Sequence, residues 1–117
     1  AILAELAGAV YSVEILPRLA RGARSILDEL GYTNVQIQVG DGHLGWPEHA
    51  PYDGILVAAA PREVPAALLS QLKEAGKLVI PVGLLNQELE VHTRRGDTFR
   101  VERVASVRFV PLVRCQA

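Results

Sequence analysis

The chain has 117 residues, half of them apolar, which is enough for one modest hydrophobic core and fits a single domain or most of one. Its formal net charge of -1 provides no broad basic surface of the kind that nucleic-acid backbones attract, so a general DNA-binding role is disfavoured. No apolar run approaches the roughly 20 residues that cross a bilayer, and the lone Cys115 excludes an internal disulfide framework and favours a reducing cytoplasm.

Helical and strand-like patterns alternate in the first part of the chain. Residues 1–8 have the composition of the end of a helix closed by a glycine, and residues 10–15, VYSVEI, have the β-branched and aromatic content of a strand. Residues 17–31 begin with proline, repeat apolar side chains at helical spacing and end with glycine, which predicts a helix. Residues 35–42, VQIQVGDG, alternate as a strand does and then break at the glycines.

The middle of the chain continues this alternation. Residues 54–60, GILVAAA, form an apolar run of the length expected for a strand buried on both faces. Residues 66–76, AALLSQLKEAG, have a helical pattern, and residues 77–82, KLVIPV, read as another buried strand. Alternating helices and strands predict a parallel sheet with crossover helices.

The alternation of helices and strands stops in the last part of the chain. Residues 87–95 and 99–110 are strand-like and flank the turn signal Gly96-Asp97, with no helical segment between them. This predicts an antiparallel hairpin at the edge of the sheet. The expected fold class is therefore α/β, a doubly wound and mostly parallel sheet with a C-terminal antiparallel hairpin.

Glu14 ends the first predicted strand of the chain. In a doubly wound sheet, ligands bind beyond the carboxyl ends of the strands, and an acid at such a tip accepts both hydroxyls of a ribose. A carboxylate has several lone-pair sites and no donor, which suits the two O–H groups of a vicinal diol. The alternative is a solvated acid near the N-terminus of the next helix, where the helix dipole favours negative charge. Position alone leaves both interpretations open.

Asp41 follows the next predicted strand, between two glycines that permit tight turns and close approach to a ligand. Its carboxylate is able to accept a hydrogen bond from an adenine amino group, whereas the alternative is an Asp-Gly turn without a ligand. Together, Glu14 and Asp41 describe an adenosine pocket, which NAD, ATP and S-adenosylmethionine would all fit. The glycine-rich turn that would distinguish them is not in the chain, which is expected to begin partway through the helix after that turn, without the first strand.

Several stretches resemble protein-L-isoaspartate O-methyltransferase, a family of S-adenosylmethionine-dependent enzymes with a Rossmann-like fold. They are VYSVEI, LGYTNVQIQVGDGHLGWPEHAPYDGILVAAAPREVP, LLSQLKEAGKLVIPVG and VRFVPL. GDGHLGWPEHAPYD followed by AAAPREVP is specific to this family, and the other pieces occur widely among methyltransferases. The resemblance implies that residues 1–117 are the C-terminal part of a single methyltransferase domain.

The resemblance also assigns roles. It implies that Glu14 holds the ribose of S-adenosylmethionine and that Asp41 and Gly42 border its adenine.

On the acceptor side, the resemblance implies that Ala58, Ala59 and Ala60 shape the floor where methyl donor and substrate meet. Extended backbone around Val110 and Pro111 would lie beside the isoaspartyl peptide.

Two departures from the family pattern stand out. Glu74-Ala75 replaces the usual Pro-Gly in a turn, a change expected to alter the geometry little, and Val113 replaces a hydroxyl residue that would supply a polar contact. The family's glycine-rich loop and the Ser/Thr motif that contacts the substrate carboxylate are expected to lie outside the chain, so no catalytic residue is named.

Other candidate groups are weaker. His43, His49 and His92 match no compact ligand spacing and have no cysteine beside them, so no metal is predicted. Trp46 either flanks the adenine or anchors its own loop. A substrate carboxylate with a pKa of about 4 is already ionised at neutral pH, so the expected methyl transfer needs no general base.

The predicted function is the repair of damaged proteins or peptides in the cytoplasm. A methyl group passes from S-adenosylmethionine to the carboxylate of L-isoaspartyl residues, leaving S-adenosylhomocysteine, with no nucleic-acid or membrane partner. The alternatives are a related methyltransferase acting on a small molecule or RNA, an inactive fragment or nucleoside-binding relative, and a piece completed by another chain. A dehydrogenase also fits the fold, because NAD enzymes share the ribose-binding acid.

Overall fold

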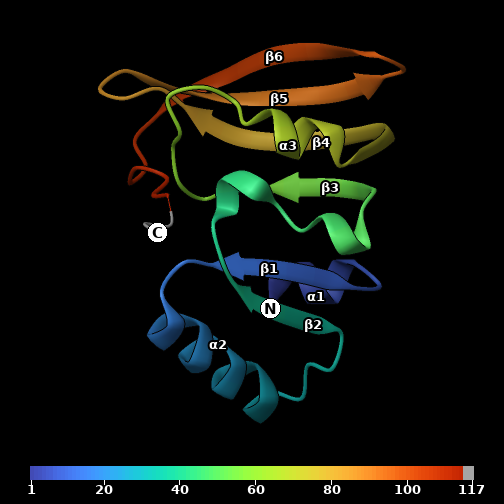
Figure 1. Cartoon of the computed structure of the whole chain (residues 1–117), viewed down its shortest axis with the longest axis vertical. Coiled ribbons are helices and arrows are strands. Elements are labelled where there is room, and N and C mark those ends of the chain that lie inside the picture. The colour runs from blue at the N-terminus through green and yellow to red at the C-terminus, as the bar shows by residue number, and fades with distance from the viewer. Residues whose placement is uncertain (115–117) are drawn as a thin grey trace. The chain divides into compact units, whose positions relative to one another are not determined.

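The computed structural model describes residues 1–114 and divides the chain into two compact units (Figure 1). The first unit contains residues 1–42 and Arg114, and the second contains residues 43–113. Cys115, on which the expectation of a reducing compartment rests, lies outside the described residues. No helix within residues 1–114 is long and apolar enough to span a membrane.

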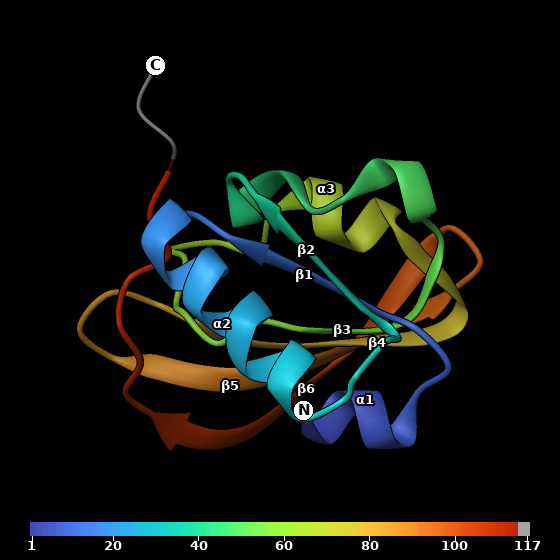
Figure 2. The same cartoon turned by 90° about the horizontal axis from the view of Figure 1, so that it is seen from below.

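The first unit is a two-stranded parallel sheet with two helices. Its elements are α1 (Ile2–Leu6), β1 (Val10–Glu14), α2 (Pro17–Glu29) and β2 (Val35–Val39). The strands pair in register from Val10 opposite Val35 to Glu14 opposite Val39, and α2 is the crossover between them (Figure 2). Gly31, with a φ of 83°, follows the helix in the left-handed conformation that glycine adopts without strain.

Polar side chains fasten the helices of this unit to β2. The Arg24 guanidinium pairs with Asp28 one turn along α2, at 2.9 Å, and also donates to the carbonyl of Val35 at the start of β2. The Asn34 amide donates to the carbonyls of Ala4 and Ala7, at 2.9 and 3.1 Å. These two carbonyls belong to the last turn of α1, where intrahelical partners are lacking, so Asn34 closes that helix.

The second unit is a four-stranded mixed sheet with one α-helix and two short 3-10 turns. In chain order these are η1 (Gly42–Leu44, of which Gly42 is the last residue of the first unit), η2 (Pro47–His49), β3 (Tyr52–Leu56), α3 (Ala66–Ser70), β4 (Leu72–Val82), β5 (Gln87–Arg95) and β6 (Thr98–Val107). The strand order is β3-β4-β5-β6, in which β3 and β4 are parallel and the other pairs antiparallel. The predicted C-terminal hairpin is confirmed, and Arg95 pairs with Thr98 across Gly96-Asp97.

The core of this unit lies where α3 meets β4. Leu68, Leu72, Leu78 and Ile80 form one buried cluster, and the last three side chains are fully buried. Burial of a leucine or isoleucine side chain contributes about 1.5 to 3 kcal/mol each. The predicted buried strand at residues 77–82 is therefore confirmed.

The predicted helix over residues 66–76 is wrong in its second half. Helix α3 ends at Ser70, and Leu72 already pairs with Tyr52 of β3. The register then shifts, so that Gly54 pairs with Lys77 and residues 73–76 bulge out of the ladder. A Cβ at Gly76 would lie 2.9 Å from the Lys73 carbonyl oxygen, which shows how closely this bulge approaches its neighbouring backbone. Tertiary pairing of Leu72 therefore overrides the helical spacing.

The predicted strand over residues 54–60 is also corrected. Regular pairing covers Tyr52–Leu56, Val57 still donates to the carbonyl of Val79 at 3.0 Å, and Ala60 forms a separate bridge. The strand is not buried on both faces, since Leu56 is 60% exposed. Within the described sheet, β3 is an edge strand that pairs with β4 alone.

Candidate functional site

Glu14 ends β1 and Asp41 follows β2, at the same edge of the first unit. The β1–β2 register sets Glu14 opposite Val39, and the N–H of Gly40 donates to the Glu14 carbonyl at 3.0 Å. Asp41 is the next residue along the chain and is half-buried, as is Glu14. The predicted strands thus end together, and the two acids come from the carboxyl ends of neighbouring strands, where ligands of such sheets bind.

The Glu14 carboxylate also serves the local structure. Its Oε1 accepts a hydrogen bond from the N–H of Leu16 at 3.1 Å, and Leu16 is the N-cap of α2. This contact agrees with the alternative interpretation of Glu14 as an acid near a helix N-terminus. This contact uses one of the roughly four lone-pair sites of the carboxylate. The carboxylate therefore retains lone pairs that suit the two O–H groups of a ribose.

A buried glutamine fixes the loop that follows Gly42. The Gln71 side chain is 6% exposed, accepts a hydrogen bond from the N–H of Trp46 at 3.0 Å and donates to the carbonyl of Leu44 at 2.9 Å. Gly45 between them has a φ of 62°, and a Cβ there would lie 2.3 Å from the glutamine oxygen. This role of Gln71 was not predicted from the sequence, although a glutamine between the leucines of LLSQL was a signal.

Trp46 contacts its own loop. Its ring packs edge-on against His49, with centroids 5.2 Å apart and planes at 69°, and its carbonyl accepts a hydrogen bond from the Tyr52 hydroxyl. These contacts support the interpretation that Trp46 anchors the loop. Contact with adenine stays a prediction.

The residues predicted for the acceptor side come together in the second unit. Ala60 and Pro111 form a parallel bridge, in which the N–H of Ala60 donates to the carbonyl of Val110 at 2.7 Å. The N–H of Leu112 donates to the carbonyl of Ala60 at 2.9 Å. Ala60 is buried, Ala59 is half-buried and Val110 is 70% exposed. Distant segments of the sequence thus form one short ladder at this point.

A second glutamine missed by sequence analysis lies beside this ladder. Gln87, at the start of β5, is 7% exposed, and its side chain binds the backbone of Phe109. The available signal in the sequence was a glutamine that opens the strand-like segment QELEVHTRR.

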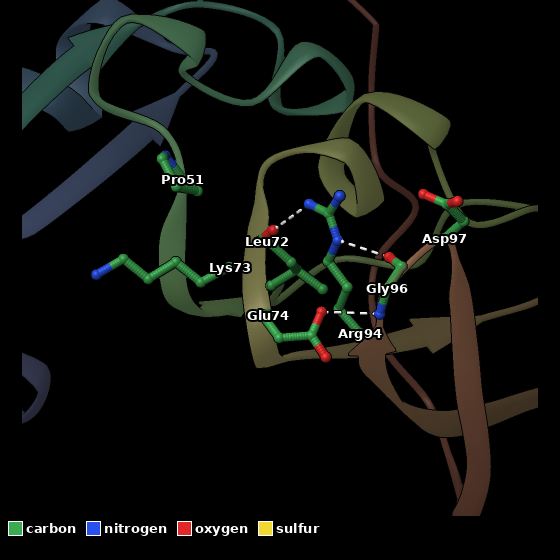
Figure 3. A pocket seen from close by; sticks show the side chains of 7 residues that line it. All are labelled: Pro51, Leu72, Lys73, Glu74, Arg94, Gly96 and Asp97. Atoms are coloured by element: carbon green, nitrogen blue, oxygen red, sulfur yellow. Dashed lines mark hydrogen bonds between the residues drawn. The ribbon is translucent and has the colours of Figure 1, made fainter.

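A hollow of about 330 Å³ lies at the other end of β4 (Figure 3). Arg94 donates to the carbonyls of Leu72 and Gly96 at 2.6 and 3.1 Å, and the Glu74 carboxylate accepts from the N–H of Gly96 at 2.8 Å. These charged groups tie the β5–β6 turn to β4. The hollow is remote from the Ala60–Pro111 bridge along the strands, so it is not the predicted acceptor site.

A cluster of polar side chains outside these sites joins β5 and β6. His92 and Glu90 are both largely buried and lie 2.8 Å apart, and Arg103 lies 3.6 Å from the same Glu90 carboxylate. Over the described residues, no group of three or more His, Cys, Asp or Glu side chains is arranged to hold a metal ion.

Comparison with known proteins decides the family. The family described as Protein-L-isoaspartate(D-aspartate) O-methyltransferase matches residues 1–117. The chain belongs to this family.

Curated family members from several bacteria are similar over nearly the whole chain. Protein-L-isoaspartate O-methyltransferase of Picosynechococcus sp. is 53% identical over 96% of this chain and 50% of its own length. Protein-L-isoaspartate O-methyltransferase 2 of Pelobacter propionicus is 53% identical over 97% of this chain and 52% of its own length. The chain therefore spans about half the length of the curated relatives it matches.

Solved structures of family members have a similar fold. One protein-L-isoaspartate O-methyltransferase superimposes with a TM-score of 0.83 at 31% identity, over 88% of this chain and 33% of the other. A putative member from Plasmodium falciparum, in complex with S-adenosyl-L-homocysteine, gives a TM-score of 0.79 at 25% identity, over 92% of this chain and 53% of the other. These similarities confirm the predicted methyltransferase fold class, in which the sheet of the second unit is mixed.

Proposed function

We propose that the chain is the C-terminal part of a single methyltransferase domain that repairs damaged proteins or peptides. Its reaction would transfer a methyl group from S-adenosylmethionine to the carboxylate of L-isoaspartyl residues. The family match over residues 1–117 carries this proposal. The Plasmodium falciparum relative in complex with S-adenosyl-L-homocysteine supports the choice of methyl donor. We further propose a cytoplasmic location and isoaspartyl proteins as partners.

On the donor side, we assign Glu14 to the ribose and Asp41 and Gly42 to the adenine. The position of both acids at the carboxyl ends of paired strands supports this assignment, and so do the remaining acceptor sites of the Glu14 carboxylate. The hydrogen bond from Leu16 to Oε1 limits rotation of the carboxylate, which favours one orientation for a diol.

On the acceptor side, we assign Ala59, Ala60, Val110 and Pro111 to the substrate peptide. Their backbone ladder supports this assignment because it provides a fixed, extended segment with small or apolar side chains. When bound, S-adenosylmethionine supplies a sulfonium methyl group that an ionised substrate carboxylate can accept, forming a methyl ester. The residues of this chain then have to orient the reactants and exclude water, an effect worth up to about 7 to 11 kcal/mol in well-aligned reactions.

Radiolabelled methyl transfer tests the function. Label from S-adenosylmethionine is expected to enter an isoaspartyl peptide and not its normal aspartyl isomer. Equal labelling of both isomers would reject the proposal. Labelling of a small molecule or RNA alone would favour a related methyltransferase instead. Calorimetric titration with S-adenosylhomocysteine separates these cases from an inactive fragment, which would show no saturable binding.

A further inference from the structure

The Gln87 side chain binds both polar groups of one backbone residue. Its Oε1 accepts a hydrogen bond from the N–H of Phe109 at 2.7 Å, and its Nε2 donates to the carbonyl of the same residue at 3.1 Å. Only this orientation of the amide satisfies both groups, since the N–H requires an acceptor and the carbonyl a donor. Nε2 also lies 3.3 Å from the carbonyl of Leu84. The side chain is 7% exposed, so water competes poorly for these contacts.

The contact extends the sheet beyond the end of β6. The backbone of Gln87 pairs with Val107, the last residue of β6, and its side chain then binds Phe109 two residues further on. The amide thus imitates the pair of N–H and C=O bonds that two antiparallel residues exchange. The Gln87 side chain therefore takes the place of a further backbone residue of β5 opposite Phe109.

The segment after Phe109 is held from a different element. The carbonyl of Val110 and the N–H of Leu112 bond to Ala60, and Pro111 is the bridge partner. Residues 109–112 are thus fastened first by a side chain of β5 and then by the backbone after β3. Because proline has no N–H, the hydrogen bonds of this bridge involve the neighbouring residues Val110 and Leu112.

We infer that Gln87 is a positioning residue that holds Val110 and Pro111 in the conformation that receives the isoaspartyl peptide. This inference rests on the proposed function of these two residues. Gln87 does not have to touch the substrate. It acts by removing the conformational freedom of residues 109–112 before the peptide binds. If peptide binding had to order these residues, the entropic cost of ordering them would weaken the affinity for the peptide.

A matched control is present in the same unit. Gln71 has the same side chain and nearly equal burial, at 6% exposed, and it also makes one donated and one accepted hydrogen bond with a loop backbone. Gln71→Met and Gln87→Met preserve side-chain volume and lose both hydrogen bonds. If the substitution acts only by lowering stability, both variants should show the same effect. If Gln87 positions residues 109–112, only Gln87→Met should change the conformational freedom of these residues.

Two measurements on the 117-residue chain test the inference. By NMR, Gln87→Met is expected to raise amide exchange at Phe109 and Leu112 about tenfold, the effect of losing hydrogen bonds of ordinary strength. Titration is expected to show about tenfold weaker binding of an isoaspartyl peptide and unchanged binding of S-adenosylhomocysteine. Gln71→Met should leave both the peptide affinity and the exchange at Phe109 unchanged.

Three results would overturn the inference. Faster exchange at Phe109 with unchanged peptide affinity would show that Gln87 has a structural role alone. Equal weakening by Gln71→Met would show that the effect is general. Equal binding of isoaspartyl and aspartyl peptides by the unaltered chain, or binding of neither, would reject the proposed function of the segment, a failure distinct from the first two. If Gln87→Met does not fold, Gln87→Asn tests the same point, because its shorter amide cannot reach both groups of Phe109.

Discussion

Replacement of Ala75 by glycine is expected to stabilise the second unit. Ala75 lies in the bulge of β4 with a φ of 63°, in the left-handed region, and its side chain is exposed. A non-glycine residue there costs about 1 to 2 kcal/mol because its Cβ approaches the following carbonyl oxygen. Glycine removes this strain but adds about 0.5 to 1 kcal/mol of conformational entropy to the unfolded chain. The net gain in unfolding free energy is therefore about 0.5 to 1 kcal/mol. The family resemblance, with Pro-Gly at Glu74-Ala75, agrees with this direction.

Urea denaturation measures the effect. With a slope of about 1 to 3 kcal/mol per M, the midpoint should rise by about 0.2 to 1 M. Ala105→Gly is the matched control, because Ala105 is an exposed residue of β6 without a positive φ, and the substitution should destabilise by about 0.5 to 1 kcal/mol. If Ala75→Gly lowers the midpoint as Ala105→Gly does, the argument from backbone strain is refuted.

Three further outcomes follow from the structure. Glu14→Gln keeps an acceptor for the N–H of Leu16, so the stability of the fold should change little. Calorimetry should show that this variant binds S-adenosylhomocysteine about tenfold to a hundredfold more weakly. The control Glu29→Gln, at an exposed position, should leave this affinity unchanged. Leu78→Ala removes a fully buried side chain and should lower the free energy of unfolding by about 2 to 5 kcal/mol in denaturant titration, and a loss below 1 kcal/mol would contradict the assigned core. The pKa of Tyr32 is raised above its ordinary 10.0, chiefly because its hydroxyl donates a hydrogen bond to the Glu5 carboxylate. This hydrogen bond is therefore present at pH values below 10 and is lost as the pH rises through the raised pKa. Spectrophotometric titration of Glu5→Gln should show one phenol shifted to lower pKa, and an unchanged curve would exclude this cause.

Local patterns predicted the first unit well. Pro17 and Gly31 mark the limits of α2, and the alternation in VQIQV marks β2, because these signals depend on neighbouring residues alone. The position of Glu14 beside the end of β2 followed from the same reasoning, since parallel strands joined by one helix end at the same edge.

Residues 66–76 show where local patterns fail. Leu68, Leu69 and Leu72 have helical spacing, yet Leu72 belongs to a strand, pairs with Tyr52 and is buried in the cluster that α3 forms with β4. Gln71 is the residue that separates the two elements, because its carbonyl accepts from the N–H of Tyr52 and its side chain is bonded to a distant loop. Rules based on the spacing of apolar residues cannot predict hydrogen bonds to residues so distant in the sequence.

The two halves of the candidate site differ in how the sequence encodes them. Glu14 and Asp41 offer functional groups directly, so their chemistry is readable from residue type and strand position. Ala60, Val110 and Pro111 have no functional side-chain group, and what they provide is a backbone geometry set by hydrogen bonds between segments far apart in the sequence. Substitutions on the donor side should therefore change ligand affinity through lost contacts, whereas those on the acceptor side should act through the position of the backbone, even from a residue such as Gln87 that meets no ligand.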